Sequence, residues 1–474
     1  MSDVVIHWFR NDLRVADNPA LFEAAQNGSV LPVYIYDTDR ADLDADGDMG
    51  AASKWWLHHS LNALKKSGVP IYCFKGKPED VLKTLQEKTG AKGIYWNRLY
   101  DPYSINRDKQ IKETLSNCHS FNGALLNEPW EIKNNQGSFY KVFTPYWRAA
   151  VEKNRHMTDG LPRSVQEKPD ITYLDQPIEN AIEIKDLDLL PSDHDWHTKF
   201  DSHWTPGEKG AKDALKTFLD GPVLSYKTDR DIPSKRGTSR LSPHLHFGEI
   251  SPHQIWQAVY GVGDQRNEDI KTFLSEIGWR EFSYYLLFHG NELKTKPFQE
   301  KFTDFTWEEN EAHFHAWKKG LTGFPIVDAG MRELWQTGYM HNRVRMIVAS
   351  FLTKNCLLHW TKGEQWFWDC LVDADPANNV AGWQWVAGCG ADAAPFFRIF
   401  NPITQSEKFD ASGEYIRRYV PELSNFSDKK IHKPFEASDQ EQSKAGCIIG
   451  KDYPAPILDL KQTRQRALDR FKEI

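Results

Sequence analysis

The chain opens with a short apolar run, Val4-Val5-Ile6-His7-Trp8-Phe9, and continues into a second, Val30-Leu31-Pro32-Val33-Tyr34-Ile35-Tyr36. Runs of this length suit buried strands and are too short to span a membrane. Two further apolar runs, at residues 70–74 and 93–96, also predict strands. Helical patterns lie between the predicted strands, at residues 53–67 and 78–90. Strands that alternate with helices predict a parallel sheet with right-handed crossovers. Residues 1–130 are therefore expected to form an α/β domain.

The pattern changes twice after this region. Residues 131–203, above all 164–202, turn polar and rich in proline and aspartate, which is typical of an interdomain linker. From residue 204 to residue 474 the apolar periodicity is helical almost throughout. The predicted fold is an α/β domain, a long linker and an all-helical domain.

Composition limits the class of protein. With 40% hydrophobic and 26% charged residues, the chain resembles an ordinary soluble globular protein, and no signal-peptide pattern precedes the first strand. The six cysteines are scattered without CxxC pairing, which argues against a disulfide framework or a zinc site and fits a reducing cytoplasm. The net charge of -7 has the wrong sign for coating DNA non-specifically, although it permits a local basic face. The 18 tryptophans suit packing, an aromatic cofactor, base stacking or electron transfer.

The helical half contains an unusual stretch of small residues between tryptophans, residues 383–402, WQWVAGCGADAAPFFRIFNP. Small residues let a backbone approach a flat partner closely, but a tightly packed helix–loop junction would have the same composition. A GxGxxG or P-loop motif is absent from the α/β region, so a nucleotide-dependent dehydrogenase or a P-loop enzyme has little support.

This stretch is similar to the flavin-domain signature of the photolyase/cryptochrome family. Four other segments resemble the same family in the right order, residues 7–14, 235–243, 276–282 and 338–346. The chain most resembles bacterial cyclobutane pyrimidine dimer photolyases, of class I or class III. The resemblance implies an α/β antenna domain and a helical domain that holds FAD, in a monomer that works in the bacterial cytoplasm with the nucleoid.

The resemblance implies a set of flavin contacts. Residues 238–242 supply hydroxyls, amides and a guanidinium at the predicted start of a helix, where phosphate is favoured. Asn379 matches the residue that faces flavin N5, where an amide, unlike a carboxylic acid, does not readily donate a proton; this favours a repair enzyme. A carboxylate beside an arginine is otherwise usually a structural ion pair. The full set is Tyr226, Thr238, Ser239, Arg240, Leu241, Ser242, Phe273, Arg345, Asp373, Ala374, Asp375 and Asn379.

The resemblance also implies residues that receive a flipped lesion. Photolyases extrude their target, and unstacking is least costly at a damaged base pair. Trp279 and Trp385 would flank the dimer, and Glu276 would hydrogen-bond the pyrimidine edge, although a lone Glu is more often a salt-bridge partner. The catalytic set is Glu276, Trp279, Met346, Asn379 and Trp385. The DNA-binding set is Arg230, Glu276, Trp279, Asn342, Arg343, Met346, Trp385 and Arg398, with Lys235, Arg236 and Lys408 as further candidates.

Asn342 and Met346 bear on the type of lesion. They are four residues apart and therefore share a helix face. In (6-4) photolyases the matching positions resemble a pair of histidines suited to acid–base work. Neither Asn nor Met transfers a proton, which direct splitting of a cyclobutane ring tolerates.

Trp383, Trp360 and Trp307 match the family's tryptophan chain for electron transfer, although each could equally be a packing residue. The chain would photoreduce oxidised flavin and take no part in repair itself. The predicted function is light-driven repair of cyclobutane pyrimidine dimers in DNA, by electron transfer from excited FADH⁻ to the flipped-out lesion. The alternatives are a cryptochrome photoreceptor without repair activity, which the lack of a long tail after the signature disfavours, and a (6-4) photolyase.

The antenna chromophore is expected to be methenyltetrahydrofolate, with a deazaflavin as the alternative. Residues 51–61 resemble class III photolyases and plant cryptochromes, and Tyr103-Ser104 stands where class I enzymes contact folate through an Asn-Glu pair. Trp55 and Trp56 would stack on a pterin or form a buried helix face. No metal is predicted, because the histidine pairs 194/197, 244/246 and 313/315 lack further ligands at suitable spacing.

Overall fold

The structure is a computed structural model that describes residues 3–40, 48–155, 160–191, 195–263, 267–290, 292–393 and 397–474. The chain divides into two compact units. Unit 1 comprises Met1–Leu224, Ser239–Asn291 and Val372–Ala377, and unit 2 comprises Ser225–Thr238, Glu292–Leu371 and Asn378–Ile474. Three residues of the tryptophan-rich stretch, 394–396, lie outside the described part.

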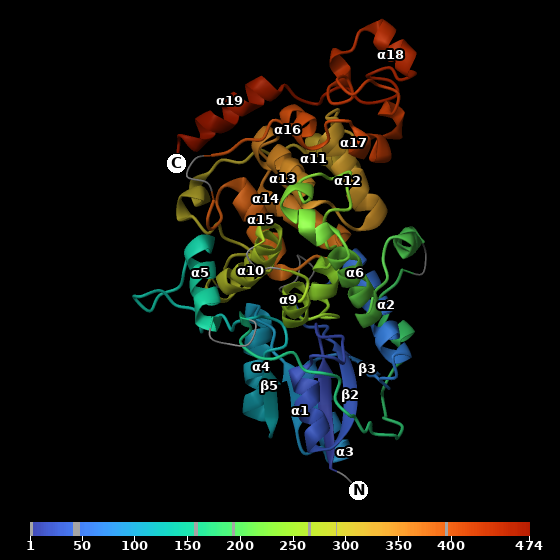
Figure 1. Ribbon diagram of the computed structural model, residues 1–474, viewed down its shortest axis with the longest axis vertical. Helices are drawn as coiled ribbons and strands as arrows, with labels where there is room; N and C mark the ends of the chain where they lie inside the picture. The colour runs from blue at the N-terminus through green and yellow to red at the C-terminus, as the bar shows by residue number, and fades with distance from the viewer. Residues whose placement is uncertain are drawn as a thin grey trace. The chain divides into compact units, whose positions relative to one another are not determined.

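Unit 1 contains a five-stranded parallel sheet with the strand order β3-β2-β1-β4-β5 (Figure 1). Its strands are β1 (Val4–Phe9), β2 (Ser29–Tyr36), β3 (Tyr72–Lys75), β4 (Ile94–Asn97) and β5 (Cys118–Phe121). The four strands predicted from apolar runs are confirmed. The fifth was missed because Cys118-His119-Ser120-Phe121 alternates polar and apolar residues and is only partly buried.

The two predicted helices are confirmed as α2 (Ala51–Lys66) and α3 (Pro78–Thr89). Two further helices follow strands of the sheet, α1 (Pro19–Asn27) and α4 (Pro102–Thr114). α3 ends at Gly90, whose φ of 68° is the left-handed conformation expected of a helix C-cap. Leu82 and Leu85 of α3 and Ile111 of α4 pack in one core cluster with alternate strand residues, among them Ile6, Trp8, Leu31 and Val33. One face of the sheet is thus buried under α3 and α4, and α1 packs against the strands outside that cluster.

The segment predicted as a linker is structured and packs on unit 1. It contains α5 (Phe143–Asn154) and two 3₁₀ turns, Ile184–Leu187 and Trp196–Ser202. Tyr173 forms an isolated bridge with Val30, and Ile182 forms one with Cys73. The remaining α-helices of unit 1 are α6 (Glu208–Leu219), α8 (Ser242–His246), α9 (Pro252–Tyr260) and α10 (Glu268–His289).

Unit 2 is helical, as predicted. Its α-helices are α7 (Tyr226–Asp229), α11 (Glu311–Lys319), α12 (Pro325–Thr337), α13 (Asn342–Ser350), α14 (Trp360–Cys370), α16 (Pro402–Phe409), α17 (Glu414–Tyr419), α18 (Asp439–Ala445) and α19 (Leu460–Phe471). α15 (Pro376–Ala387) begins in unit 1 and continues in unit 2. Within the described ranges, the only β-structure after Ser202 is isolated bridges. No helix of these ranges is long and apolar enough to cross a membrane.

Glu281 on α10 is a buried carboxylic acid, and this gives unit 1 a pH dependence. The side chain accepts a hydrogen bond from the backbone N–H of Asn127 at 3.1 Å. Burial raises the pKa of Glu281 to about 7, although the charge of Arg280 and backbone amides favour the carboxylate. The folded protein therefore binds a proton that the unfolded chain releases at lower pH, and this stabilisation is lost as pH rises from about 4.5 towards 7.

Replacing Glu281 by Gln should stabilise the protein at pH 8 by up to about 3 kcal/mol, because the amide stands in for the protonated acid. At pH 5 the two proteins should unfold almost alike. Thermal unfolding followed by circular dichroism at both pH values measures the difference, with the exposed Glu179→Gln as the control for loss of charge. An equal shift at pH 5 and pH 8 would contradict the assignment.

Candidate functional site

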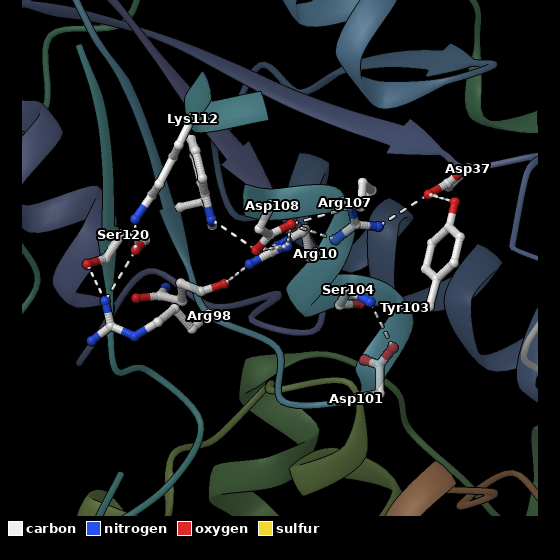
Figure 2. Close-up of polar contacts among 12 residues, drawn as sticks. Arg10, Asp37, Arg98, Asp101, Tyr103, Ser104, Arg107, Asp108, Lys112 and Ser120 are labelled. Carbon is white, nitrogen blue, oxygen red and sulfur yellow. Dashed lines mark hydrogen bonds and ion pairs between the residues drawn. The ribbon is translucent and has the colours of Figure 1, made fainter. Parts of the chain in front are cut away.

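Buried charged side chains line the carboxyl ends of strands β1, β2 and β4 in unit 1 (Figure 2). Arg10 donates from Nη1 to both carboxylate oxygens of Asp108, at 2.9 and 2.8 Å. Arg107 donates from Nη2 to Asp108 at 2.9 Å and from Nη1 to Asp37 at 3.0 Å. Both guanidinium groups lie over the Trp8 ring, 4.7 and 4.9 Å from its centroid. The positive charges at this edge are therefore compensated by carboxylates.

Trp8 and Ser104 at the same edge are buried, with exposed fractions of 1% and 0%. Next to Ser104, the Tyr103 hydroxyl donates to Asp37 at 3.0 Å. Ligands of open α/β sheets bind at the carboxyl ends of the strands. The half-buried Tyr103 ring and the balanced charge network beside it are suited to a flat ligand that forms hydrogen bonds.

Trp55 and Trp56, considered for stacking on a pterin, are packing residues of α2. Their exposed fractions are 1% and 0%. Trp56 Nε1 donates to Glu249 at 3.0 Å, and its ring meets the Trp204 ring edge-on at 5.3 Å between centroids. The structure thus favours the alternative of a buried helix face, and these rings do not offer a surface for a ligand.

The predicted phosphate-binding segment, residues 238–242, leads into α8, which begins at Ser242 as expected. The helix has only five residues, and no side chain caps its first turn. Its dipole is therefore weak, and the argument from a helix N-terminus contributes less here than the sequence suggested. Arg240 has a left-handed φ of 54°, and its guanidinium lies 4.2 Å from the centroid of the Trp204 ring. A cation and hydroxyls, more than the helix, would attract an anion.

Asp373 lies beside this segment, within the same unit. It accepts a hydrogen bond from the Ser242 hydroxyl at 2.6 Å. Two other predicted flavin contacts, Phe273 and Ala374, are 3% and 1% exposed, and the Phe273 ring packs against Phe218 at 4.6 Å between centroids. These two residues are therefore part of the packed interior of unit 1.

Asp375 is a buried carboxylate with several donors. It accepts hydrogen bonds from the Tyr284 hydroxyl and, at 3.0 Å, from the backbone N–H of Ala377 at the start of α15, and His246 Nδ1 lies 3.3 Å away. Burial alone would favour the neutral acid, but the hydrogen bond and charge of His246 and the charge of Arg280 hold the pKa of Asp375 well below its usual range. Asp375 is therefore a fixed negative charge and acceptor.

In unit 2 the Asn379 amide has a defined orientation. Its Nδ2 donates to the Glu364 backbone oxygen at 3.1 Å and to Glu364 Oε1 at 2.9 Å. Because a carboxylate only accepts, this pairing fixes which end of the amide carries nitrogen. The Asn379 oxygen therefore lies on the side of the amide away from Glu364. Arg345 donates from Nε to the Met340 oxygen at 2.7 Å. The other predicted flavin contacts of this unit are Tyr226, buried, and Thr238, half-buried.

Glu276 and Trp279 lie one turn apart on α10 and share a face. Trp279 is half-buried and stacks on Phe143 of α5, with ring centroids 3.8 Å apart and an interplanar angle of 11°. Gly278, between them, lies so close to Trp147 that an added Cβ would be 2.7 Å from its ring. This close approach holds α10 against α5 and fixes the direction of Trp279.

On α13, Asn342 is exposed and Met346 half-buried. Between them, Arg343 donates from Nη2 and Nε to Asp231 Oδ1, at 2.7 and 3.2 Å, and its Nη1 lies 3.6 Å from the Met346 sulfur. Elsewhere in the unit, the Trp385 indole donates to the Asp392 oxygen at 3.2 Å. Two further predicted DNA contacts are Arg398, exposed, and Arg230, which lies over the Tyr226 ring.

The three tryptophans predicted for electron transfer lie in unit 2. The rings of Trp307 and Trp360 both contact His359, at centroid distances of 5.2 and 5.6 Å. Trp383 packs on α14 at Gly363, where an added Cβ would lie 2.1 Å from its ring. Trp360 and Trp383 are 1% and 3% exposed, whereas Trp307 is only half-buried. Trp307, the last residue of the predicted path, is therefore the most exposed of the three.

The structure adds residues that sequence reasoning missed: Phe143 under Trp279, His246 and Tyr284 on Asp375, Glu364 on Asn379, His359 between two tryptophans, and Asp231 on Arg343. Each lies far along the chain from its partner or has an unremarkable local sequence, so periodicity and spacing carry no signal for it. As for metals, no suitable group of His, Cys, Asp or Glu occurs among the described residues, which do not include His194.

Comparison with known proteins adds independent information. Two family models match, "DNA photolyase" over residues 5–167 and "FAD binding domain of DNA photolyase" over residues 273–473. The chain is 48% identical to a deoxyribodipyrimidine photo-lyase of Agrobacterium fabrum, over 99% of this chain and 98% of that protein. It is 35% identical to Cryptochrome-1 of Arabidopsis thaliana, over 99% of this chain and 70% of the relative.

Solved structures agree with these matches. The fold superposes on a bacterial class III photolyase from Agrobacterium tumefaciens with a TM-score of 0.93 and 47% identity, covering 100% of this chain and 98% of the other. A cryptochrome from Synechocystis matches with a TM-score of 0.88 and 29% identity, covering 98% and 99%.

Proposed function

Because the chain belongs to the photolyase/cryptochrome family, we propose that it repairs cyclobutane pyrimidine dimers in DNA in a light-driven reaction. The observation that carries the choice of lesion is α13, which presents Asn342 and Met346 one turn apart. Neither side chain exchanges a proton at neutral pH, so the helix is unsuited to the acid–base chemistry expected of a (6-4) enzyme. Splitting of a cyclobutane ring by one electron needs no such pair.

FAD, in its fully reduced form, supplies the absorption of light and the transferable electron. In this proposal the flavin contacts of unit 1 include Asp373, Asp375 and residues 239–242. Those of unit 2 are Asn379, Arg345, Tyr226 and Thr238. Asp375 holds a negative charge, and the pairing with Glu364 assigns the nitrogen and oxygen ends of the Asn379 amide. An amide oxygen there would accept a hydrogen bond from a reduced flavin and could not protonate it. This orientation supports an enzyme that works with reduced flavin.

For the lesion, Trp279 supplies a stacking surface that Phe143 backs, and Glu276 on the same helix face supplies an acceptor for the imide N–H of a pyrimidine. Stacking on an aromatic side chain recovers part of the cost of extruding the damaged bases. Phosphate contacts from Arg343, Arg398 and Arg230 supply affinity that is independent of sequence and falls with salt.

The antenna chromophore, methenyltetrahydrofolate in this proposal and a deazaflavin as the alternative, binds at the carboxyl ends of strands β1, β2 and β4. The charge-balanced network around Arg107 and the half-buried Tyr103, whose hydroxyl donates to Asp37, support this position. The domain limits of 1–130, 131–203 and 204–474, the monomeric state and the cytoplasmic location also remain predictions.

The test is an anaerobic repair assay with purified, photoreduced protein and an oligonucleotide that carries one cyclobutane thymine dimer. We expect loss of the dimer under blue light and no loss in the dark. A duplex with a (6-4) lesion should stay unrepaired. Repair of the (6-4) lesion would overturn the choice of substrate. If reduced, flavin-loaded protein repaired neither lesion, the chain would instead be a photoreceptor, the activity suggested by its cryptochrome relatives.

A further inference from the structure

Arg343, a proposed phosphate contact, is already paired in the protein alone. Its Nε and Nη2 both donate to Asp231 Oδ1, at 3.2 and 2.7 Å. The two side chains are 22% and 36% exposed, so the pair lies at the surface and is open to solvent. Both residues belong to unit 2, with Asp231 just beyond α7 and Arg343 in the first turn of α13.

The guanidinium is held on more than one side. Its central carbon lies 4.5 Å from the centroid of the Phe409 ring, and its Nη1 lies 3.6 Å from the sulfur of Met346. Met346 is one of the residues proposed to contact the lesion. A ligand that moves the Met346 side chain would therefore also act on the Arg343 guanidinium, because the two are in direct contact.

Asp231 is a carboxylate that lies among arginine side chains. The charges of Asp231, Arg343, Arg345 and Arg230 all act on the nearby His341, and its backbone N–H donates to Glu333 at 3.1 Å. Burial, together with the arginines, lowers the pKa of His341 to about 4, so it contributes no charge at neutral pH. Asp231 pairs with the exposed side of Arg343, so a DNA phosphate that approached this guanidinium would be repelled by Asp231.

We propose that Asp231 is a specificity-determining residue, which keeps Arg343 from DNA phosphate until a lesion occupies the face of α13 beside Met346. This inference rests on the proposed function, because it takes damaged DNA as the ligand. On an undamaged duplex the ion pair persists, and the carboxylate repels the backbone. When a flipped lesion contacts Met346, the guanidinium exchanges Asp231 for phosphate, which matches its fork of donors equally well. Discrimination arises because the wrong ligand meets an unfavourable charge.

The experiment measures dissociation constants of Asp231→Asn for an undamaged duplex and for the same duplex with one thymine dimer, over a range of salt concentrations. We expect undamaged DNA to bind roughly two- to fivefold more tightly, the range for a partly exposed ion pair. The slope of log affinity against log salt should steepen by about one unit, because Arg343 then neutralises a phosphate in every complex. Affinity for the dimer should change less, so the ratio of the two affinities falls.

Asp428→Asn is the matched control. It removes the same charge from an exposed carboxylate of unit 2 that pairs with Arg417, a residue outside the DNA-binding set. This variant should bind both duplexes like wild type, and an equal gain would overturn the inference by showing a general charge effect. Flavin content and the thermal midpoint report whether each variant is folded.

Arg343→Gln and the double variant complete the design. If Asp231 acts through Arg343, adding Asp231→Asn to Arg343→Gln brings no gain on undamaged DNA; a gain that persists overturns the inference. An Asp231→Asn protein that binds undamaged DNA no better than wild type, while wild type still prefers the dimer, overturns the inference alone. A wild-type protein that does not prefer the dimer overturns the proposed function.

Discussion

Phenylalanine in place of Trp383 should slow the light-driven reduction of oxidised flavin by roughly tenfold or more, which corresponds to about 1.4 kcal/mol of added barrier. Phenylalanine is much harder to oxidise than tryptophan, so the path through the interior loses a relay. The substitution keeps an apolar ring in the space beside Gly363 and Phe367, where Trp383 packs. The measurement is the rate of loss of oxidised-flavin absorbance under blue light with an external reductant.

Chemically reduced Trp383→Phe protein should still repair the dimer, because the three tryptophans only reduce the flavin and do not act on the lesion. The control is Trp335→Phe, a tryptophan of the same unit that is 52% exposed and outside the proposed chain. Its photoreduction should match that of wild type. If Trp383→Phe were reduced as fast as wild type, Trp383 would be a packing residue.

The architecture was largely predictable because apolar periodicity reports burial. The strands at Val4–Phe9 and Ser29–Tyr36 are almost wholly buried and carry an unbroken apolar signal. The strand Cys118–Phe121 lies at the sheet edge and is half polar, so it has no such signal. In the segment predicted as a linker, Tyr173 and Ile182 form single bridges to the sheet strands, and one-residue contacts leave no periodicity.

The candidate site was predictable only where motifs fix a residue's role. Asn379 was identified from its place in a motif, but its orientation depends on Glu364, fifteen positions earlier. The choice between stacking and packing for Trp55 and Trp56 required their burial. Likewise, Arg343 read as a free phosphate contact, whereas Asp231 neutralises it from 112 positions away. Partnerships between distant residues are products of the tertiary fold, and local sequence does not encode them visibly.

Truncation of Trp279 to alanine should weaken binding of a dimer-containing duplex by about 1–3 kcal/mol, the cost of losing one stacked base. The side chain sits on Phe143 at 3.8 Å between ring centroids, so its plane is set before any ligand arrives. A ring that is already held in place loses little entropy on binding, so its removal costs most of the stacking free energy. Affinity for undamaged DNA should hardly change, because phosphate contacts supply it.

The matched variants are Trp279→Phe and Phe143→Leu. The first keeps a ring that can stack on both Phe143 and the lesion, so most of the affinity should return. The second keeps Trp279 but removes the ring beneath it, so a smaller loss is expected. Fluorescence anisotropy with dimer and undamaged duplexes measures all three. An equal loss on both duplexes would mean that Trp279 supports the fold of α10 and α5 and does not stack on the lesion.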